Sequence, residues 1–152
     1  MTDQVKISPA IDDSDLASLS YRYAAALDQR DLPALLEVFH PDATLRARPP
    51  GRGPMVLTGH RELAKLIAAV SYWQRTSHLV GQGLFHVEST RAFGEVHCVA
   101  HHFNTCAPDL LDDDVMYIRY FDTYVRADHG HWVIMKRMVS TDAQKHVKTP
   151  AG

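Results

Sequence analysis

The chain has 152 residues, 45% of them hydrophobic, which suffices for one domain with a buried core. Its 16 Lys and Arg residues nearly balance 18 Asp and Glu residues, and the formal net charge of −2 argues against a large basic surface for nucleic acid or an anionic membrane. The longest mainly apolar stretch, residues 63–73, is interrupted by Lys65 and is shorter than the roughly 20 residues of a membrane-spanning helix. We therefore expect one soluble domain over residues 1–152, with its core at about residues 12–143.

The first half of the chain predicts helices. Apolar residues recur at spacings of three and four from Leu16 to Leu27, which predicts an amphipathic helix at residues 15–29 with Asp28 in its last turn. A second, short helix is expected at residues 32–39, where a proline occupies the first turn. These two helices are expected to form a hairpin.

A short hairpin and a third helix are expected next. Residues 43–48 and 55–57 favour two short strands, separated by a loop of prolines and glycines at residues 49–54. A helix is expected from Thr58 or Gly59 to about residue 73.

The second half of the chain predicts strands. The alternating or β-branched stretches are residues 77–88, 93–104, 115–126 and 131–141. Early helices followed by long antiparallel strands indicate an α+β domain, in which helices cover one face of a curved sheet and a pocket lies between them.

Two stretches resemble SnoaL-like domains of the nuclear transport factor 2-like superfamily. Residues 21–31 (YRYAAALDQRD) and 39–43 (FHPDA) are similar to the opening of these domains. Residues 119–126 (RYFDTYVR), followed by Trp132 and Arg137, are similar to their final hairpin. The resemblance implies a cone-shaped curved antiparallel sheet covered by N-terminal helices, also described as a cystatin-like α+β barrel.

Within this superfamily, the chain most resembles the group of scytalone dehydratase, bile-acid 7α-dehydratase and hexachlorocyclohexane dehydrochlorinase. The resemblance implies a catalytic Asp at the end of the first helix and a catalytic His on the strand after the third, which are Asp28 and His78 here. Tyr23 matches a tyrosine of the bile-acid dehydratase, whereas the tyrosine directly before the Asp of scytalone dehydratase is replaced by Leu27.

The same group often carries another polar residue on the next long strand, where this chain has His101 and His102. Side chains alternate between the faces of a strand, so only one of the two can line the pocket. The spacing of the bile-acid dehydratase favours His101 as the catalytic residue, and a bulge in the strand would reverse this choice in favour of His102. The residues expected to contact substrate are His102, Tyr120, Trp73, Phe39 and Arg137. Arg137 could alternatively form a structural ion pair with Asp122.

These residues favour a cofactor-independent lyase or isomerase. A His with a carboxylate behind it can take a proton from carbon, because the carboxylate fixes the tautomer and stabilises the imidazolium. His78 would be the base and Asp28 its partner, while Tyr23 and the strand histidine would bind a carbonyl or protonate a leaving hydroxyl. The resemblance implies a cyclic, largely apolar substrate that bears a carbonyl, such as a polyketide or steroid. The alternatives are a polyketide cyclase, or a non-catalytic ligand-binding or dioxygenase β-subunit-like module of the same fold.

We expect no metal and no nucleotide cofactor. His97 and His101 are four residues apart, a separation of roughly 13 Å on a strand, which is too far for one ion. The triplet Asp112 to Asp114 is expected to be a solvated loop before a strand.

We also expect a cytoplasmic homo-oligomer, either a dimer or a trimer. The N-terminal residues lack the pattern of a secretory signal. Apolar strand residues such as Met116, Ile118, Val133 and Met135 are too numerous to fit inside one small cone.

Overall fold

The computed structural model describes residues 9–152, with side chains from residue 12 onward. Its helices are α1 (Pro9–Gln29), α2 (Leu32–Glu37), α3 (Gly59–Leu63), α4 (Lys65–Val70) and the 3-10 turn η1 (Asp128–Gly130). Its strands are β1 (Phe39–Ala47), β2 (Met55–Thr58), β3 (Arg75–Val87), β4 (Arg91–Ala107), β5 (Leu110–Arg126) and β6 (Trp132–Pro150). Over these residues, none of the helices is both long and apolar enough to cross a membrane.

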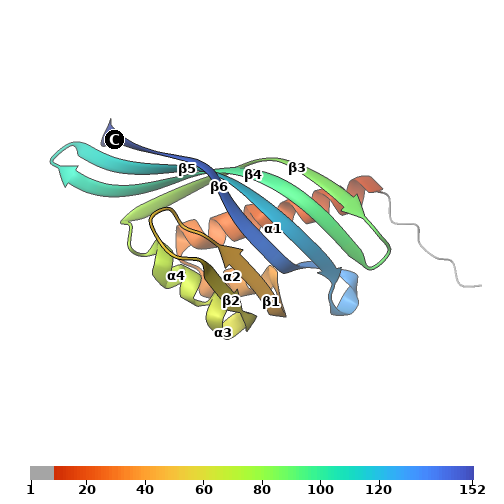
Figure 1. Cartoon of the computed structure of the whole chain (residues 1–152). Coiled ribbons are helices and arrows are strands. Elements are labelled where there is room, and N and C mark those ends of the chain that lie inside the picture. Colours follow the sequence, from red (N-terminus) through yellow and green to blue (C-terminus); the bar gives the residue numbers. More distant parts are fainter. Residues whose placement is uncertain (1–8) are drawn as a thin grey trace, which may run out of the picture.

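The six strands form one sheet in the order β2-β1-β6-β5-β4-β3. Neighbouring strands are antiparallel, except that β1 runs parallel to β6. The long strands β3 to β6 curve together, and α1 lies along one side of them while α2, α3 and α4 gather near β1 and β2 (Figure 1). The expected α+β class, a curved sheet covered by helices, is confirmed.

The hydrophobic core fills the space between the helices and the concave face of the sheet. Its largest fully buried side chains include Leu16, Leu19, Leu35, Phe39, Leu45 and Ile134. Burying a side chain of this size contributes about 1.5–3 kcal/mol, so this layer holds α1 against the sheet.

Several elements differ from the sequence expectation because tertiary pairing decides their limits. The second helix ends at Glu37, and β1 begins at Phe39, which pairs with Ile134 of β6. The expected third helix is broken at Ala64 into α3 and α4.

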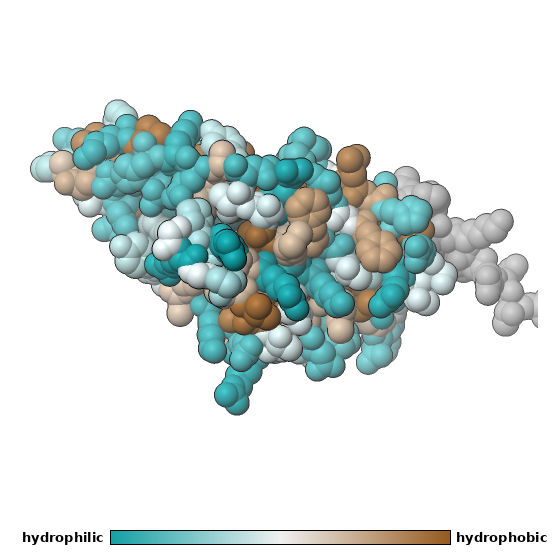
Figure 2. Space-filling model, viewed as in Figure 1, coloured by the Kyte–Doolittle hydropathy of each residue, from teal (hydrophilic) through white to brown (hydrophobic). Residues whose placement is uncertain are grey.

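The expectation of a solvated loop at Asp112–Asp114 is wrong, because β5 begins at Leu110 and includes these residues. Asp112 and Asp114 lie opposite Lys148 and His146 of β6, and His146 hydrogen-bonds to both carboxylates. The charges are thus matched across the sheet. The arm formed by the β4–β5 hairpin and the end of β6 has a mostly hydrophilic surface on the face shown in Figure 2.

The apolar strand residues that were expected to be too numerous for the interior, Met116, Ile118, Val133 and Met135, lie mostly inside the protein. Met116 and Ile118 line an internal cavity, and Val133 is buried. The convex face of the sheet instead exposes other large apolar side chains, among them Leu79, Leu84 and Phe93.

Candidate active site

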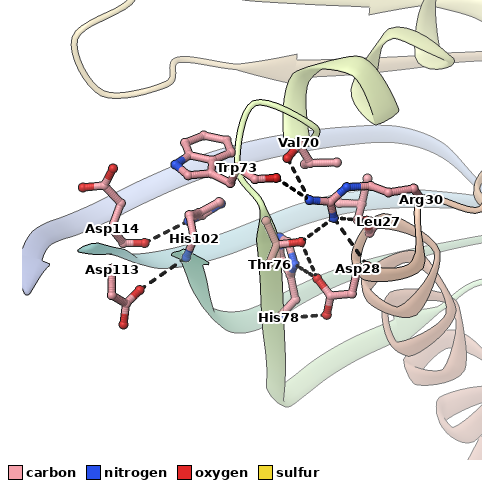
Figure 3. Close-up of polar contacts among 10 residues, drawn as sticks. All are labelled: Leu27, Asp28, Arg30, Val70, Trp73, Thr76, His78, His102, Asp113 and Asp114. Carbon is pink, nitrogen blue, oxygen red and sulfur yellow. Dashed lines mark hydrogen bonds and ion pairs between the residues drawn. The ribbon is translucent and has the colours of Figure 1, made fainter. Parts of the chain in front are cut away.

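A carboxylate at the end of α1 meets an imidazole on β3. The Nδ1 atom of His78 is 2.7 Å from Oδ1 of Asp28, and the backbone N–H of His78 donates to Oδ2 of the same carboxylate at 2.9 Å. The hydroxyl of Thr76 also donates to Oδ1, at 2.8 Å (Figure 3). Burial alone would raise the pKa of Asp28, but the hydrogen bonds from the His78 ring and backbone and from Thr76 hold it below its ordinary value. Asp28 is therefore ionised at neutral pH.

This contact fixes the tautomer of His78. An ionised carboxylate only accepts hydrogen bonds, so Nδ1 of His78 carries a proton, and in the neutral imidazole the lone pair lies on Nε2. The His78 side chain is 5% exposed and lines an internal cavity. The arrangement presents a basic nitrogen to whatever occupies that cavity.

Arg30, which has no role in the sequence expectation, positions the Asp28–His78 pair. It follows α1 with φ of 58°, the left-handed conformation common at helix ends. Its guanidinium donates to the carbonyls of Val70 and Trp73 at 2.9 and 3.2 Å and to the hydroxyl of Thr76 at 2.8 Å. Thr76 in turn donates to Asp28, so Arg30 connects the ends of α1 and α4 to the start of β3. In the sequence, the only local indication of this role of Arg30 is that a basic residue directly follows a helix.

The cavity beside His78 has a volume of about 400 Å³ and lies between α1, α4, the sheet and the loop 48–54. This volume falls in the usual range for small-molecule sites. Its walls are mainly apolar and include Leu27, Leu45, Met55, Leu66, Val70, Met116, Ile118 and Val139. Its wall also contains side chains that can take part in hydrogen bonding or proton transfer, among them Tyr23, Trp73, His78, His102 and Tyr120.

His102 is the second imidazole of the cavity. Its ring nitrogen Nδ1 donates to the backbone carbonyl of Asp114 at 2.9 Å, and its ring packs on Trp73 with centroids 4.3 Å apart (Figure 3). It meets the ring of His78 edge to face at 5.8 Å. Burial lowers the pKa of His102, and the neighbouring His78 lowers it further, against the opposing effect of the Asp114 carbonyl. His102 is therefore neutral at pH 7, with Nε2 as an acceptor.

The expectation that His101 faces the pocket is wrong. His101 lies on the convex face of the sheet, where its Nδ1 is 2.7 Å from Asp113 and its ring stacks on Phe103. No bulge interrupts β4 between Ala92 and His102, so the alternation runs on unchanged. The sequence holds a signal for this choice, since His102 shares its phase with the buried Ala92, Val96, Cys98 and Ala100.

Two tyrosines close the inner end of the cavity. The rings of Tyr23 and Tyr120 meet edge to face at 5.6 Å, and both line the cavity. The Arg137 guanidinium lies 4.4 Å from the Tyr23 centroid and 4.1 Å from the Tyr120 centroid. Burial raises the pKa of Tyr23 to about 12 and that of Tyr120 well above its ordinary value, although Arg137 opposes the shift. Both phenols thus keep their protons and can donate hydrogen bonds.

Arg137 and Phe39, both expected to contact substrate, lie outside the cavity wall. Arg137 is buried and forms a two-pronged ion pair with Asp122 at 2.7 and 2.9 Å, while it also donates to Ser20. This is the structural ion pair considered as the alternative. Phe39 is buried behind Tyr23, with ring centroids 5.9 Å apart. Both residues support the tyrosines from behind.

Comparisons with known proteins agree with this fold. A family model described as a SnoaL-like domain matches residues 9–138. The chain belongs to the SnoaL-like family. A search of curated proteins found no significant match.

Solved structures extend the comparison of this SnoaL-like protein. A candidate scytalone dehydratase from Novosphingobium aromaticivorans superposes with a TM-score of 0.75 and 22% identity, over 93% of each chain. A candidate aromatic ring hydroxylase from the same species gives 0.77 and 20%, over 94% of this chain and 96% of the other. A hexachlorocyclohexane dehydrochlorinase, LinA type 3 from Novosphingobium barchaimii, gives 0.74 and 16% over 91% of each chain. At these identities the similarity shows the fold alone, and it confirms the nuclear transport factor 2-like architecture.

Proposed function

We propose that this SnoaL-like protein is a cofactor-independent lyase of the dehydratase type, with His78 as the base that removes a proton from carbon. The observation that carries the proposal is the 2.7 Å contact between Asp28 and His78 beside a cavity with mainly apolar walls. The proposed substrate is a cyclic, largely apolar molecule with a carbonyl group, such as a polyketide or steroid.

The first step is proton transfer to Nε2 of His78 from the carbon next to the carbonyl. The imidazolium that forms faces the ionised Asp28, and their attraction is less screened in a buried site than in water. The electron pair of the broken C–H bond moves onto the carbonyl oxygen. Tyr23 lines the cavity and its phenol is protonated, so we assign it the hydrogen bond to this oxygen. The hydroxyl of Tyr120 is engaged with the Cys98 thiol.

The second step expels a hydroxyl from the adjacent carbon. The enolate electrons form the new C=C bond, the C–O bond breaks, and the proton held by His78 leaves with the hydroxyl as water. His102 is a poor proton donor because its pKa is lowered and its Nδ1–H is used by the Asp114 carbonyl. We assign His102 the role of acceptor for the substrate hydroxyl, which orients the leaving group.

The structural relatives support elimination as the reaction class. Dehydration and dehydrochlorination, the reactions in the names of two relatives, both remove a proton from one carbon and a leaving group from the next. If the enolate is conjugated with a further C=C bond of the substrate, return of the proton to the far carbon of that dienolate shifts the double bond and makes the protein an isomerase, with the same base.

A test of the base does not require the natural substrate. Cyclic ketones incubated with the protein in D₂O should exchange their α-hydrogens for deuterium, which NMR detects. We expect exchange above the buffer rate for the native protein and none above it for His78→Ala. The matched control is His97→Ala, because His97 lies on the same sheet but is partly exposed and outside the cavity wall. Exchange in His78→Ala at the native rate would overturn the assignment.

A further inference from the structure

The loop between β1 and β2 places two arginines in the wall of the cavity. Arg48 and Arg52 both line it, together with Pro49, Pro50 and Gly53 of the same loop. The loop is a turn in which the backbone N–H of Arg52 donates to the carbonyl of Pro49 at 3.1 Å. Two consecutive prolines restrict the backbone directly after Arg48.

These arginines have no carboxylate partner among the residues that the structure describes. The arginines engaged in ion pairs there are Arg22, Arg119, Arg126 and Arg137. Among the side chains described from residue 12 onward, Asp114 is the only carboxylate that lines the cavity, and it is held by His146 at 2.7 Å. Arg48 and Arg52 are exposed, so the loop side of the cavity carries two positive charges without an ion-pair partner at its mouth in the described part of the chain, although the whole chain has a formal net charge of −2.

We propose that Arg48 and Arg52 form an anion-binding subsite, so that the ligand of this cavity is an apolar cyclic molecule with an acidic substituent. Only the reaction of this ligand at His78 rests on the proposed function; its binding at the two arginines does not. A guanidinium is planar and binds carboxylate, sulfonate or phosphate oxygens through two parallel hydrogen bonds. The apolar walls hold the ring system, and the loop holds the acidic group.

The subsite sets the orientation of the ligand. Fixing the acidic end at the loop leaves the apolar end to enter the cavity toward His78, His102 and the two tyrosines. A ligand without the acidic group would lose this contact with the loop and could bind in more than one orientation.

Two dyes with the same aromatic framework test this subsite without any turnover. Anilinonaphthalene sulfonate carries a negative charge and N-phenyl-naphthylamine is neutral, and both fluoresce in apolar surroundings. Titration of each dye should show displacement of one by the other, because both occupy the same cavity. In the double variant Arg48→Gln/Arg52→Gln, we expect the affinity for the sulfonate to fall about three- to tenfold while the affinity for the neutral amine is unchanged.

The matched control is Arg46→Gln/Arg61→Gln, which removes the same charge from two exposed arginines outside the cavity wall and should leave both affinities unchanged. Raising the salt concentration should weaken sulfonate binding in the native protein more than in the double variant. An unchanged sulfonate affinity, an equal loss for both dyes, or failure of one dye to displace the other would overturn the subsite. His78→Ala should still bind both dyes, so failure of the elimination chemistry is separable from failure of this inference.

Discussion

Asp28 holds His78 at two points, since its carboxylate accepts from both the ring Nδ1 and the backbone N–H of that one residue. The ring contact fixes the tautomer, and the backbone contact fixes the position of the strand relative to the end of α1. The acid group therefore has both a chemical and a structural role.

Replacing Asp28 by Asn should separate these two roles. The amide keeps the size of the side chain but cannot balance the imidazolium charge, and its NH₂ group can select the other tautomer of His78. We expect α-hydrogen exchange to fall about 10²–10⁴-fold, measured by NMR in D₂O. Tyr23→Phe removes one hydroxyl and keeps the ring packed, so its loss should be smaller. A larger loss in Tyr23→Phe than in His78→Ala would identify the tyrosine as the acid or base.

The lowered pKa of Asp28 makes the fold sensitive to acid. The unfolded chain takes up the proton at the ordinary carboxyl pKa, and the folded protein takes it up only at lower pH. The stabilisation is therefore complete above the ordinary pKa of about 4 and is lost as the pH falls through the lower folded value. Urea unfolding at a series of pH values should show a shallower loss of stability below pH ~4 in Asp28→Asn than in the native protein. Equal slopes would contradict a lowered pKa.

His102 should titrate below an ordinary histidine. Its folded pKa is lowered, so the unfolded chain binds the proton first, and this residue reduces stability as the pH falls below about 6.5. The resonance of its ring proton, followed by NMR, should shift at a lower pH than the ordinary histidine pKa of about 6.5. Trp73→Ala should move the His102 pKa up toward the ordinary value, because it opens the ring to water. A native pKa at or above the ordinary value would refute the neutral acceptor role.

Arg30→Ala should destabilise the protein. It removes the donor to the carbonyls of Val70 and Trp73; the Val70 carbonyl keeps the N–H of Trp73 at 3.2 Å, whereas the Trp73 carbonyl loses this partner, at a cost of about 1–3 kcal/mol. Lys should restore little, because one ammonium cannot copy the planar set of donors. The control Arg22→Ala loses one exposed ion pair with Glu37 and should change stability by less than about 1 kcal/mol. Thermal or urea unfolding measures the stability of both variants. An equal loss of stability in Arg30→Ala and Arg22→Ala would show that the buried contacts of Arg30 contribute no more than an exposed ion pair.

We expect the protein to form a dimer or trimer through the convex face of its sheet. Leu84 and Phe93 are 74% and 40% exposed there, and water contact with such side chains is unfavourable. Sedimentation velocity at micromolar concentration should show an oligomer, and Phe93→Glu should shift it toward monomer. The control is Val56→Glu, since Val56 is 51% exposed on β2 at the far edge of the sheet. A native monomer would contradict the expectation.

The sequence locates the main features of the site where they depend on short-range patterns. Periodicity predicts that Asp28 lies in the last turn of a helix and that His78 lies near the start of a strand. The resemblance to the dehydratase group is what singles out these two residues. His102 could have been chosen over His101 from the buried phase of β4. Arg30 and Thr76 could not have been found in this way, because their partners are far away in the chain and include backbone carbonyls, which every residue has. The strand at Asp112–Asp114 could not be predicted for a similar reason, because the charges of its carboxylates are balanced by residues of β6, which come much later in the chain.

The end of β6 contributes to the site from outside the region that the family model matches, which ends at residue 138. Thr141 and Gln144 line the cavity, and His146 holds Asp114, whose carbonyl orients His102. The end of β6 therefore shapes the cavity, and through Asp114 it also acts on the position of His102. Substitutions at Thr141 or Gln144 can change the surroundings of the ligand while the hydrogen bonds between Asp28 and His78 stay intact.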